Sequence, residues 1–417
     1  MSKYDILIPP GLVFVFVALT VCNAWANDEL KGLEIADGLS GRAEEAPRDS
    51  RIFMESTLGN VDSQGGSGQV STLAIDYRGQ YKLTTKLQMN ISDRVDWNHS
   101  PTDINWKNTL REVNLSWQLN NTTAIDFGRI NAQFGEAIAF NPTDYFREGS
   151  LRTVTSIVPS NMRNNRQGAL MVRAQHLWEG GAVTAIVSPA VNESSSNAPL
   201  SLNLSSTNPK DRWLLSFSES IKNGITPQVV LAGSQKDSMQ IGLNISFLPA
   251  PEFVAYFEGA TGRKRSTLSS INAWPDDARQ RSQVATGLTW SAADNLSITM
   301  EYDYDETGNN ADQRAALARM PLAVIAAYKT ALIYRQQFLN RNNFFMSGTW
   351  KDFPVPRVNL TALTRRDLDD KSQQYWLEVR NRLRKIDIAL QYQVNSGGEG
   401  TTFGALRRIN VLLDIFF

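Results

Sequence analysis

The last twelve residues of the chain, 406–417, alternate between two kinds of side chain without a break. One set is apolar throughout and the other is mixed; the sets are Ile409, Val411, Leu413, Ile415, Phe417 and Arg408, Asn410, Leu412, Asp414, Phe416. Consecutive side chains of a β-strand point to opposite faces of its sheet. The segment therefore predicts a strand with one apolar face and one mixed face, ending on an aromatic residue.

The same alternation recurs along the chain in segments of roughly ten residues with charges on the second face. Examples are residues 82–91, 112–119, 239–247, 296–305 and 385–393. Many such segments indicate an all-β fold, a transmembrane antiparallel up-and-down β-barrel in which only alternate residues face lipid. A soluble β-sandwich or β-helix is the alternative, but the aromatic strand ends Trp117, Trp290 and Trp350 fit interfacial girdles better.

The connections between these segments alternate in length. Short ones include Gly79-Gln80, Asn120-Asn121 and Glu179-Gly180. The others lie near 60–69, 98–106, 131–165, 190–210, 235–237, 262–280, 306–338, 367–371 and 395–404, and most are longer. Outer-membrane barrels have short periplasmic turns and long external loops, and this parity gives about eighteen strands over residues 51–417. The segments near 51–58 and 253–259 have the weakest pattern, so sixteen strands is the alternative.

The first 26 residues read as a secretory signal peptide. Lys3 precedes an apolar run at 11–21, and Ala24-Trp25-Ala26 forms an A-x-A cleavage pattern, so the mature chain is expected to begin at Asn27. A membrane anchor is the alternative, but the run is short for one. Residues 27–50 are polar and unpatterned, and we expect a periplasmic N-terminal segment there. The predicted location is the cell outer membrane, in contact with its lipid and lipopolysaccharide.

Two long connections are candidates for control of the lumen. Residues 131–165 contain apolar side chains together with Arg147, Arg152 and Arg163, which predicts an inward constriction loop that presents guanidinium groups to anions. The alternative is a seal in which these arginines pair with acids of the same loop. Residues 306–338 combine helix-forming residues with an apolar face. They predict a helical external loop, which either caps the lumen or lies on the outer rim of the barrel.

Charge on the predicted lumen face is segregated. A basic stripe follows the C-terminal strands and comprises Arg365, Arg380, Arg382, Arg384 and Arg408. An acidic stripe comprises Glu301, Asp303 and Asp305. Facing stripes of opposite sign would set up a transverse field that orients dipolar solutes in a pore. The alternative is that the stripes neutralise each other in a closed lumen.

The composition gives little support to other classes of function. The chain has 42 basic and 42 acidic residues, so its neutral charge gives no case for nucleic-acid binding. Its only histidines are His99 and His176, which leaves no transition-metal cluster and little basis for hydrolytic catalysis. We expect no enzyme, no metal and no cofactor.

Local motifs add a family resemblance. Gly128-Arg129, Phe134-Gly135-Glu136 and the run from Phe140 to Asp144 are similar to those of the Gram-negative outer-membrane porin superfamily, and the chain resembles the alginate-export type in particular. That resemblance implies eighteen strands, an arginine-rich lumen and occluding loops. The functional hypothesis is passive diffusion or export of hydrophilic solutes, including anionic ones or polysaccharide. The alternative is a loop-sealed, non-conducting barrel that serves a periplasmic export or surface-assembly partner.

Overall fold

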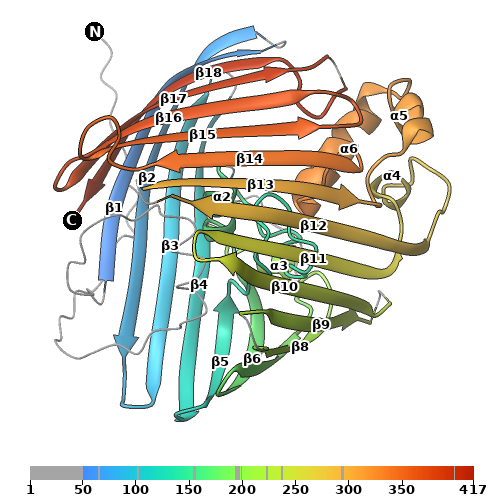
Figure 1. The fold of residues 1–417 in the computed structure, drawn as a ribbon. Coiled ribbons are helices and arrows are strands. Elements are labelled where there is room, and N and C mark those ends of the chain that lie inside the picture. The colour runs from blue at the N-terminus through green and yellow to red at the C-terminus, as the bar shows by residue number, and fades with distance from the viewer. Residues whose placement is uncertain are drawn as a thin grey trace.

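The computed structural model describes residues 50–417, apart from 64–65, 101–102, 154–155, 193–197, 199, 222–223, 236–237, 293–294 and 399. In this part of the chain, eighteen antiparallel strands form one closed sheet, because β1 pairs with both β2 and β18 (Figure 1). The predicted all-β barrel of eighteen strands is confirmed, including its two weakest strands. The predicted signal peptide and nearly all of the predicted N-terminal segment lie outside the described residues; only Ser50 is described, as the first residue of β1.

The strands follow one another around the barrel in chain order. Their bounds are β1 Ser50–Ser63, β2 Gly66–Lys82, β3 Leu87–Ser100, β4 Asp103–Asn120, β5 Thr123–Ile130, β6 Ala169–Trp178, β7 Gly181–Ser188, β8 Arg212–Glu219, β9 Thr226–Ser234, β10 Gln240–Ala250, β11 Phe253–Lys264, β12 Arg279–Ser291, β13 Leu296–Asp305, β14 Asn342–Trp350, β15 Val358–Asp367, β16 Gln373–Arg382, β17 Ile386–Ser396 and β18 Leu406–Phe416.

Alternation along each strand separates an outer apolar face from an inner, largely polar face. In β18, Ile409 and Val411 point outward and are 51% and 49% exposed, whereas Leu412 and Asp414 point inward and are 8% and 6% exposed. An outward band of apolar side chains is stable where it meets lipid rather than water. None of the described helices is both long and apolar enough to cross a bilayer.

The four longest connections, 131–168, 189–211, 265–278 and 306–341, all lie at the same end of the barrel, which we call the long-loop end. The opposite end carries short turns, as the length parity predicted. Two expected loops are shorter than predicted, because β1 reaches Ser63 and β2 begins at Gly66, and because β3 and β4 cover most of 98–106. Polar residues suit these stretches because strands that project beyond lipid meet water.

The turn predicted at Gly79-Gln80 is wrong, since β2 continues to Lys82 and the turn occupies residues 83–86. Gly79 lies within the strand between two tyrosines of the same face, Tyr77 and Tyr81. A Cβ atom at this position would collide with both rings. The glycine therefore makes room for aromatic side chains and does not form a turn.

Short helices occupy the long connections: α2 Pro159–Asn164, α3 Leu204–Thr207, α4 Thr267–Ser270, α5 Ala311–Leu317 and α6 Leu322–Arg335. Asn310 caps α5 through a reciprocal capping box with Gln313. Helices α4, α5 and α6 gather at the long-loop end, where Leu268, Leu317, Tyr328, Leu332 and Leu339 form a common apolar core (Figure 1). The predicted helical external loop therefore folds as a helical cap, which we define as residues 265–278 and 306–341.

Candidate functional site

The connection between β5 and β6, residues 131–168, enters the barrel; we call it the inward loop. On one side its Phe146 packs with Met171, Ile186 and Leu214 of the wall formed by β6–β9. On the other side its apolar residues Ile138, Ala139, Ile157 and Val158 pack against Phe345, Leu363 and Trp376 of β14–β16. The loop therefore crosses the lumen from one wall to the other, as predicted for an inward loop.

Acidic side chains of β11 and β13 hold the inward loop by its backbone. Glu301 accepts hydrogen bonds from the amides of Ile138 at 2.7 Å, Ala139 at 2.9 Å and Phe140 at 3.1 Å. It also accepts the Tyr256 hydroxyl at 2.6 Å. Glu258 accepts the amide of Ala137 at 2.5 Å. We call Glu258 and Glu301, with the four consecutive amides 137–140, the carboxylate latch. Buried backbone amides require acceptors, and two carboxylates supply them here.

The predicted acidic stripe is therefore covered by the loop. Glu301, Asp303 and Asp305 are 1%, 0% and 0% exposed. Asp305 accepts hydrogen bonds from Gln283 and Thr307, where the strand leads into the helical cap. Side chains so deeply buried do not act on solutes in pore water. Of the three acids, Glu301 holds the inward loop, whereas the partners of Asp305 lie outside that loop.

The three predicted loop arginines donate to carbonyl oxygens. Arg147 donates to Asn141 at 2.6 Å, and its guanidinium carbon lies 4.4 Å from the ring centre of Phe140. Arg163 donates to Gly135 and Ala137, inside the same loop. Arg152 donates to Ser201 and Ala198 of the next long connection. These contacts brace the loop, and a gating role for the three arginines stays a prediction.

The predicted basic stripe is divided among several partners. Arg380 bridges Glu378 at 2.8 Å and Asp414 at 2.5 Å. Arg382 pairs with Asp352 of a short turn at 2.9 Å, and Arg384 lies in the turn between β16 and β17. Arg365 donates to the carbonyl of Ile157 and so holds the inward loop at 3.0 Å. Arg408 is half-buried and has no ion-pair partner among the described residues.

A charge network at the barrel seam was not foreseen from the sequence. Glu55 of β1 and Asp414 of β18 are directly opposite each other in the ladder that closes the barrel. Like charges in this position repel. Arg94 reaches from β3 to bridge Glu55 at 2.7 Å and Asp96 at 2.8 Å, while Arg380 holds Asp414 from the other side. We call these two arginines and their carboxylates the seam network.

A second buried arginine cluster surrounds the point where the inward loop leaves and rejoins the wall. Arg111 of β4 pairs with Asp76 at 2.5 Å and donates to Asn165 of the loop at 2.9 Å. Arg166 pairs with Asp144, also at 2.5 Å, with both side chains about 2% exposed. These pairs join residues far apart in sequence, so alternation alone gave no signal for them.

Accessible charges line the wall formed by β16–β18 and β1–β3, and Arg173 of β6 is also 24% exposed. The side chain of Arg78 on β2 is 48% exposed, and that of Arg380 is 20% exposed, against 1% or less for the acids under the inward loop. The site thus has a covered acidic side and a solvated side with fixed charges of both signs. Such a polar, charged lumen wall is suited to the passage of hydrophilic solutes.

No protein-family model matches the sequence, and no curated protein matches it either. Solved structures do match: Acinetobacter baumannii OccAB1 has a TM-score of 0.55 and 10% identity, covering 88% of this chain and 96% of that one. Pseudomonas aeruginosa OccK5 (OpdH) gives 0.53 and 10%, covering 88% and 98%. Pseudomonas aeruginosa OpdQ gives 0.53 and 9%, covering 89% and 99%.

These matches do not support the resemblance to alginate-export barrels that the local motifs around 128–147 indicated. A motif of a few residues is weakly specific, whereas the fold comparison spans nearly nine-tenths of the chain. The chain is similar in fold to the eighteen-stranded Gram-negative outer-membrane porins of the Occ/OprD group.

Proposed function

We propose that this protein is an outer-membrane channel through which small hydrophilic solutes, including anionic ones, diffuse down their concentration gradient. One observation carries the proposal. The inward loop is latched to β11 and β13, while charged side chains of β16–β18 and β1–β3 stay accessible beside it. The likeness in fold to outer-membrane porins supports the same reading.

The register of the seam strands distributes the fixed charges along the path. Arg408 pairs in the ladder with Val61 near the long-loop end, whereas Arg78 pairs with Arg51 near the short-turn end. The seam network lies between these two levels. A solute would therefore meet a basic group at each end and a mixed region between, where each of the two seam arginines lies within ion-pair distance of three carboxylates. Charges of both signs at close quarters favour solutes that are small and polar.

Neither polysaccharide export nor a sealed barrel with an export partner is supported by the fold comparisons. The proposal includes residence in the outer membrane, with lipid and lipopolysaccharide against the apolar outer band. It includes no enzymatic activity and no bound cofactor.

Swelling of proteoliposomes tests the proposal. Vesicles that contain the full mature chain would be diluted into isosmotic solutions of a neutral sugar, a zwitterionic amino acid and a carboxylate salt of similar size. We expect swelling above that of protein-free vesicles for at least the smallest solutes. Absence of swelling, from protein whose folding is verified by heat-modifiable gel mobility, would refute a diffusion channel.

A further inference from the structure

Four basic side chains gather at the short-turn end of the barrel, where β1 begins and β2 turns into β3. They are Arg51 of β1, Arg78 and Lys82 of β2, and Lys86 of the turn that follows, and all four are exposed. Strand alternation places Arg51, Arg78 and Lys82 on the inner face, at the entrance to the lumen. We call these four residues the basic mouth.

The basic mouth contains an unfavourable contact. Arg51 and Arg78 lie directly opposite each other in the ladder between β1 and β2. Like charges in this position repel and destabilise the strand pair. Asp76 lies 3.5 Å from Nε of Arg78, but this acid is 1% exposed and already pairs with Arg111 at 2.5 Å. Arg51 has no ion-pair partner among the described residues, so the pair keeps a surplus of positive charge.

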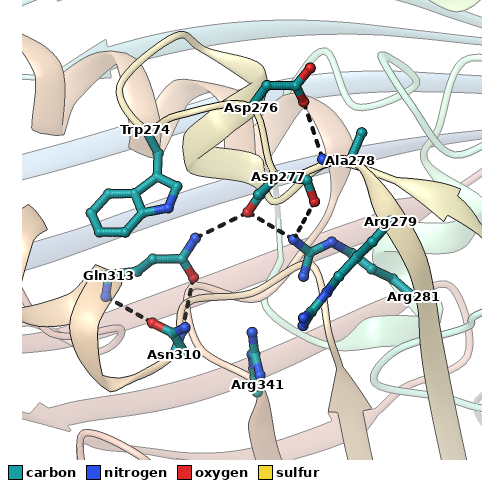
Figure 2. Close-up of a pocket in the computed structure, with 9 residues that line it drawn as sticks. All are labelled: Trp274, Asp276, Asp277, Ala278, Arg279, Arg281, Asn310, Gln313 and Arg341. Carbon is teal, nitrogen blue, oxygen red and sulfur yellow. Dashed lines mark hydrogen bonds and ion pairs between the residues drawn. The ribbon is translucent and has the colours of Figure 1, made fainter.

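The arginines of the long-loop end are arranged differently. Arg281 pairs with Asp277 at 2.7 Å, as Figure 2 shows, and Arg279 pairs with Glu306, also at 2.7 Å. Their partners are acids of the same end of the barrel. In the described part of the chain, Arg51 and Arg78 have no exposed acid within ion-pair distance. A compensating negative charge for these two arginines would therefore come from elsewhere.

The chain carries such a charge immediately before β1. Residues 27–49 contain seven acidic and three basic side chains, a net charge of −4. Residues 1–26 contain only Lys3 and Asp5 as charged side chains, so removal of the predicted signal peptide leaves this balance unchanged. The acidic segment joins the barrel at Ser50, directly before the first arginine of the basic mouth.

The length of the connection allows direct contact. Glu44 and Glu45 precede Ser50 by six and five residues. An extended chain spans at most about 3.3–3.6 Å per residue, so both carboxylates can reach roughly 20 Å from Ser50. Arg51 and Arg78 lie on neighbouring strands, which are about 4.8 Å apart. Both guanidinium groups are therefore well within reach of both carboxylates.

We propose that residues 27–49 bind the basic mouth, with the carboxylates of Glu44 and Glu45 on Arg51 and Arg78. Exposed ion pairs are weak one by one, but a short tether gives the segment a high effective concentration at this site. The consequence for transport, which rests on the proposed function, is a smaller positive charge at this end of the lumen. Binding itself does not require a conducting lumen.

Disulfide cross-linking of the full mature chain in detergent tests the contact and leaves its charges in place. The only cysteine, Cys22, lies in the predicted signal peptide, so introduced cysteines have no competitor in the mature chain. Ala46→Cys stands beside Glu45, and Gln80→Cys lies on the exposed inner face of β2. Oxidation by copper phenanthroline should join the two, which is read as loss of thiols that react with a maleimide-bearing polyethylene glycol.

Salt and charge variants separate binding from simple proximity. A change from about 0.1 M to about 1 M salt shortens the Debye length from about 10 Å to about 3 Å, and should slow disulfide formation at least about threefold. Glu44→Gln with Glu45→Gln should slow it by a similar factor, since two ion pairs are lost. Arg42→Gln, the matched control, removes a nearby charge of the opposite sign and should not slow it.

The outcomes that would overturn the proposal follow from these rates. They are equal rates in the native and the doubly neutralised segment, an equal slowing by Arg42→Gln, a rate that does not respond to salt, or no disulfide in protein folded by heat-modifiable mobility. Planar-bilayer recording measures the consequence: removal of residues 27–47 should shift the reversal potential in a salt gradient toward anions. An unchanged potential would refute the effect on permeation, whereas a chain that cross-links but never conducts would refute the channel alone.

Discussion

The substitution Glu301→Gln tests the carboxylate latch. Glu301 accepts four hydrogen bonds, three from the inward loop and one from Tyr256. Glutamine keeps one acceptor oxygen and places a donor where the second oxygen accepted. Ile138 and Tyr256 share one carboxylate oxygen, and Ala139 and Phe140 share the other, so at least one of the three loop bonds is lost. At about 1.5–3 kcal/mol for each bond to a buried charged group, the loop loses at least about 1.5–3 kcal/mol of anchoring.

Amide hydrogen exchange, read by mass spectrometry on peptides that cover residues 137–140, measures this loss. A penalty of that size should accelerate exchange of these amides at least roughly 10- to 10²-fold, while the strands of the barrel stay protected. Asp303→Asn is the matched control. It makes the same replacement of a carboxyl group by an amide on the same buried strand face, and Asp303 has no hydrogen bond to the described part of the loop. Unchanged exchange in Glu301→Gln, or equal acceleration in both variants, would refute the latch.

Three more changes address the seam, the charge of the path and the cap. Arg94→Gln leaves Glu55 opposite Asp414 without its neutralising arginine, so chemical denaturation should show a free energy of unfolding lower by about 3–5 kcal/mol. An unchanged denaturation midpoint would contradict the seam network. Arg408→Glu should shift the reversal potential in a salt gradient toward cation preference, whereas Arg407→Glu, on the other strand face, should shift it less; equal shifts would contradict a lumen position for Arg408. Leu332→Ala, in the apolar core of the helical cap, should cost about 2–5 kcal/mol of cap stability and speed proteolysis there, and unchanged cleavage would count against a folded cap.

The barrel could be predicted from the sequence because its signal is local. Side chains at alternate positions decide which face meets lipid, and a strand such as β18 carries that information within about ten residues. The lengths of the connections gave the number of strands, since long loops and short turns alternate from one strand to the next. Gly79 was misread because glycine serves both turns and close packing, and the two tyrosines that need its space are informative only once the strand is known.

The partners of the lumen charges could not be predicted in the same way. The sequence places Glu301 on the inner face, but the amides it accepts come from residues about 160 positions earlier, through a loop path that alternation does not describe. Arg380 looked like a free cation because Asp414 becomes its neighbour only when β18 pairs with β17, one strand away from β16. Strand position could be predicted residue by residue, whereas charge pairing depends on side chains that reach across the sheet and on the inward loop.

Single-channel recording of the full mature chain in a planar bilayer tests the central claim most directly, namely that solutes pass beside a latched inward loop. The account predicts stepwise openings in the native protein and larger, less uniform steps in Glu301→Gln, since a released loop no longer holds one position. Protein that is folded by heat-modifiable mobility but gives no steps, in either form, would contradict the account.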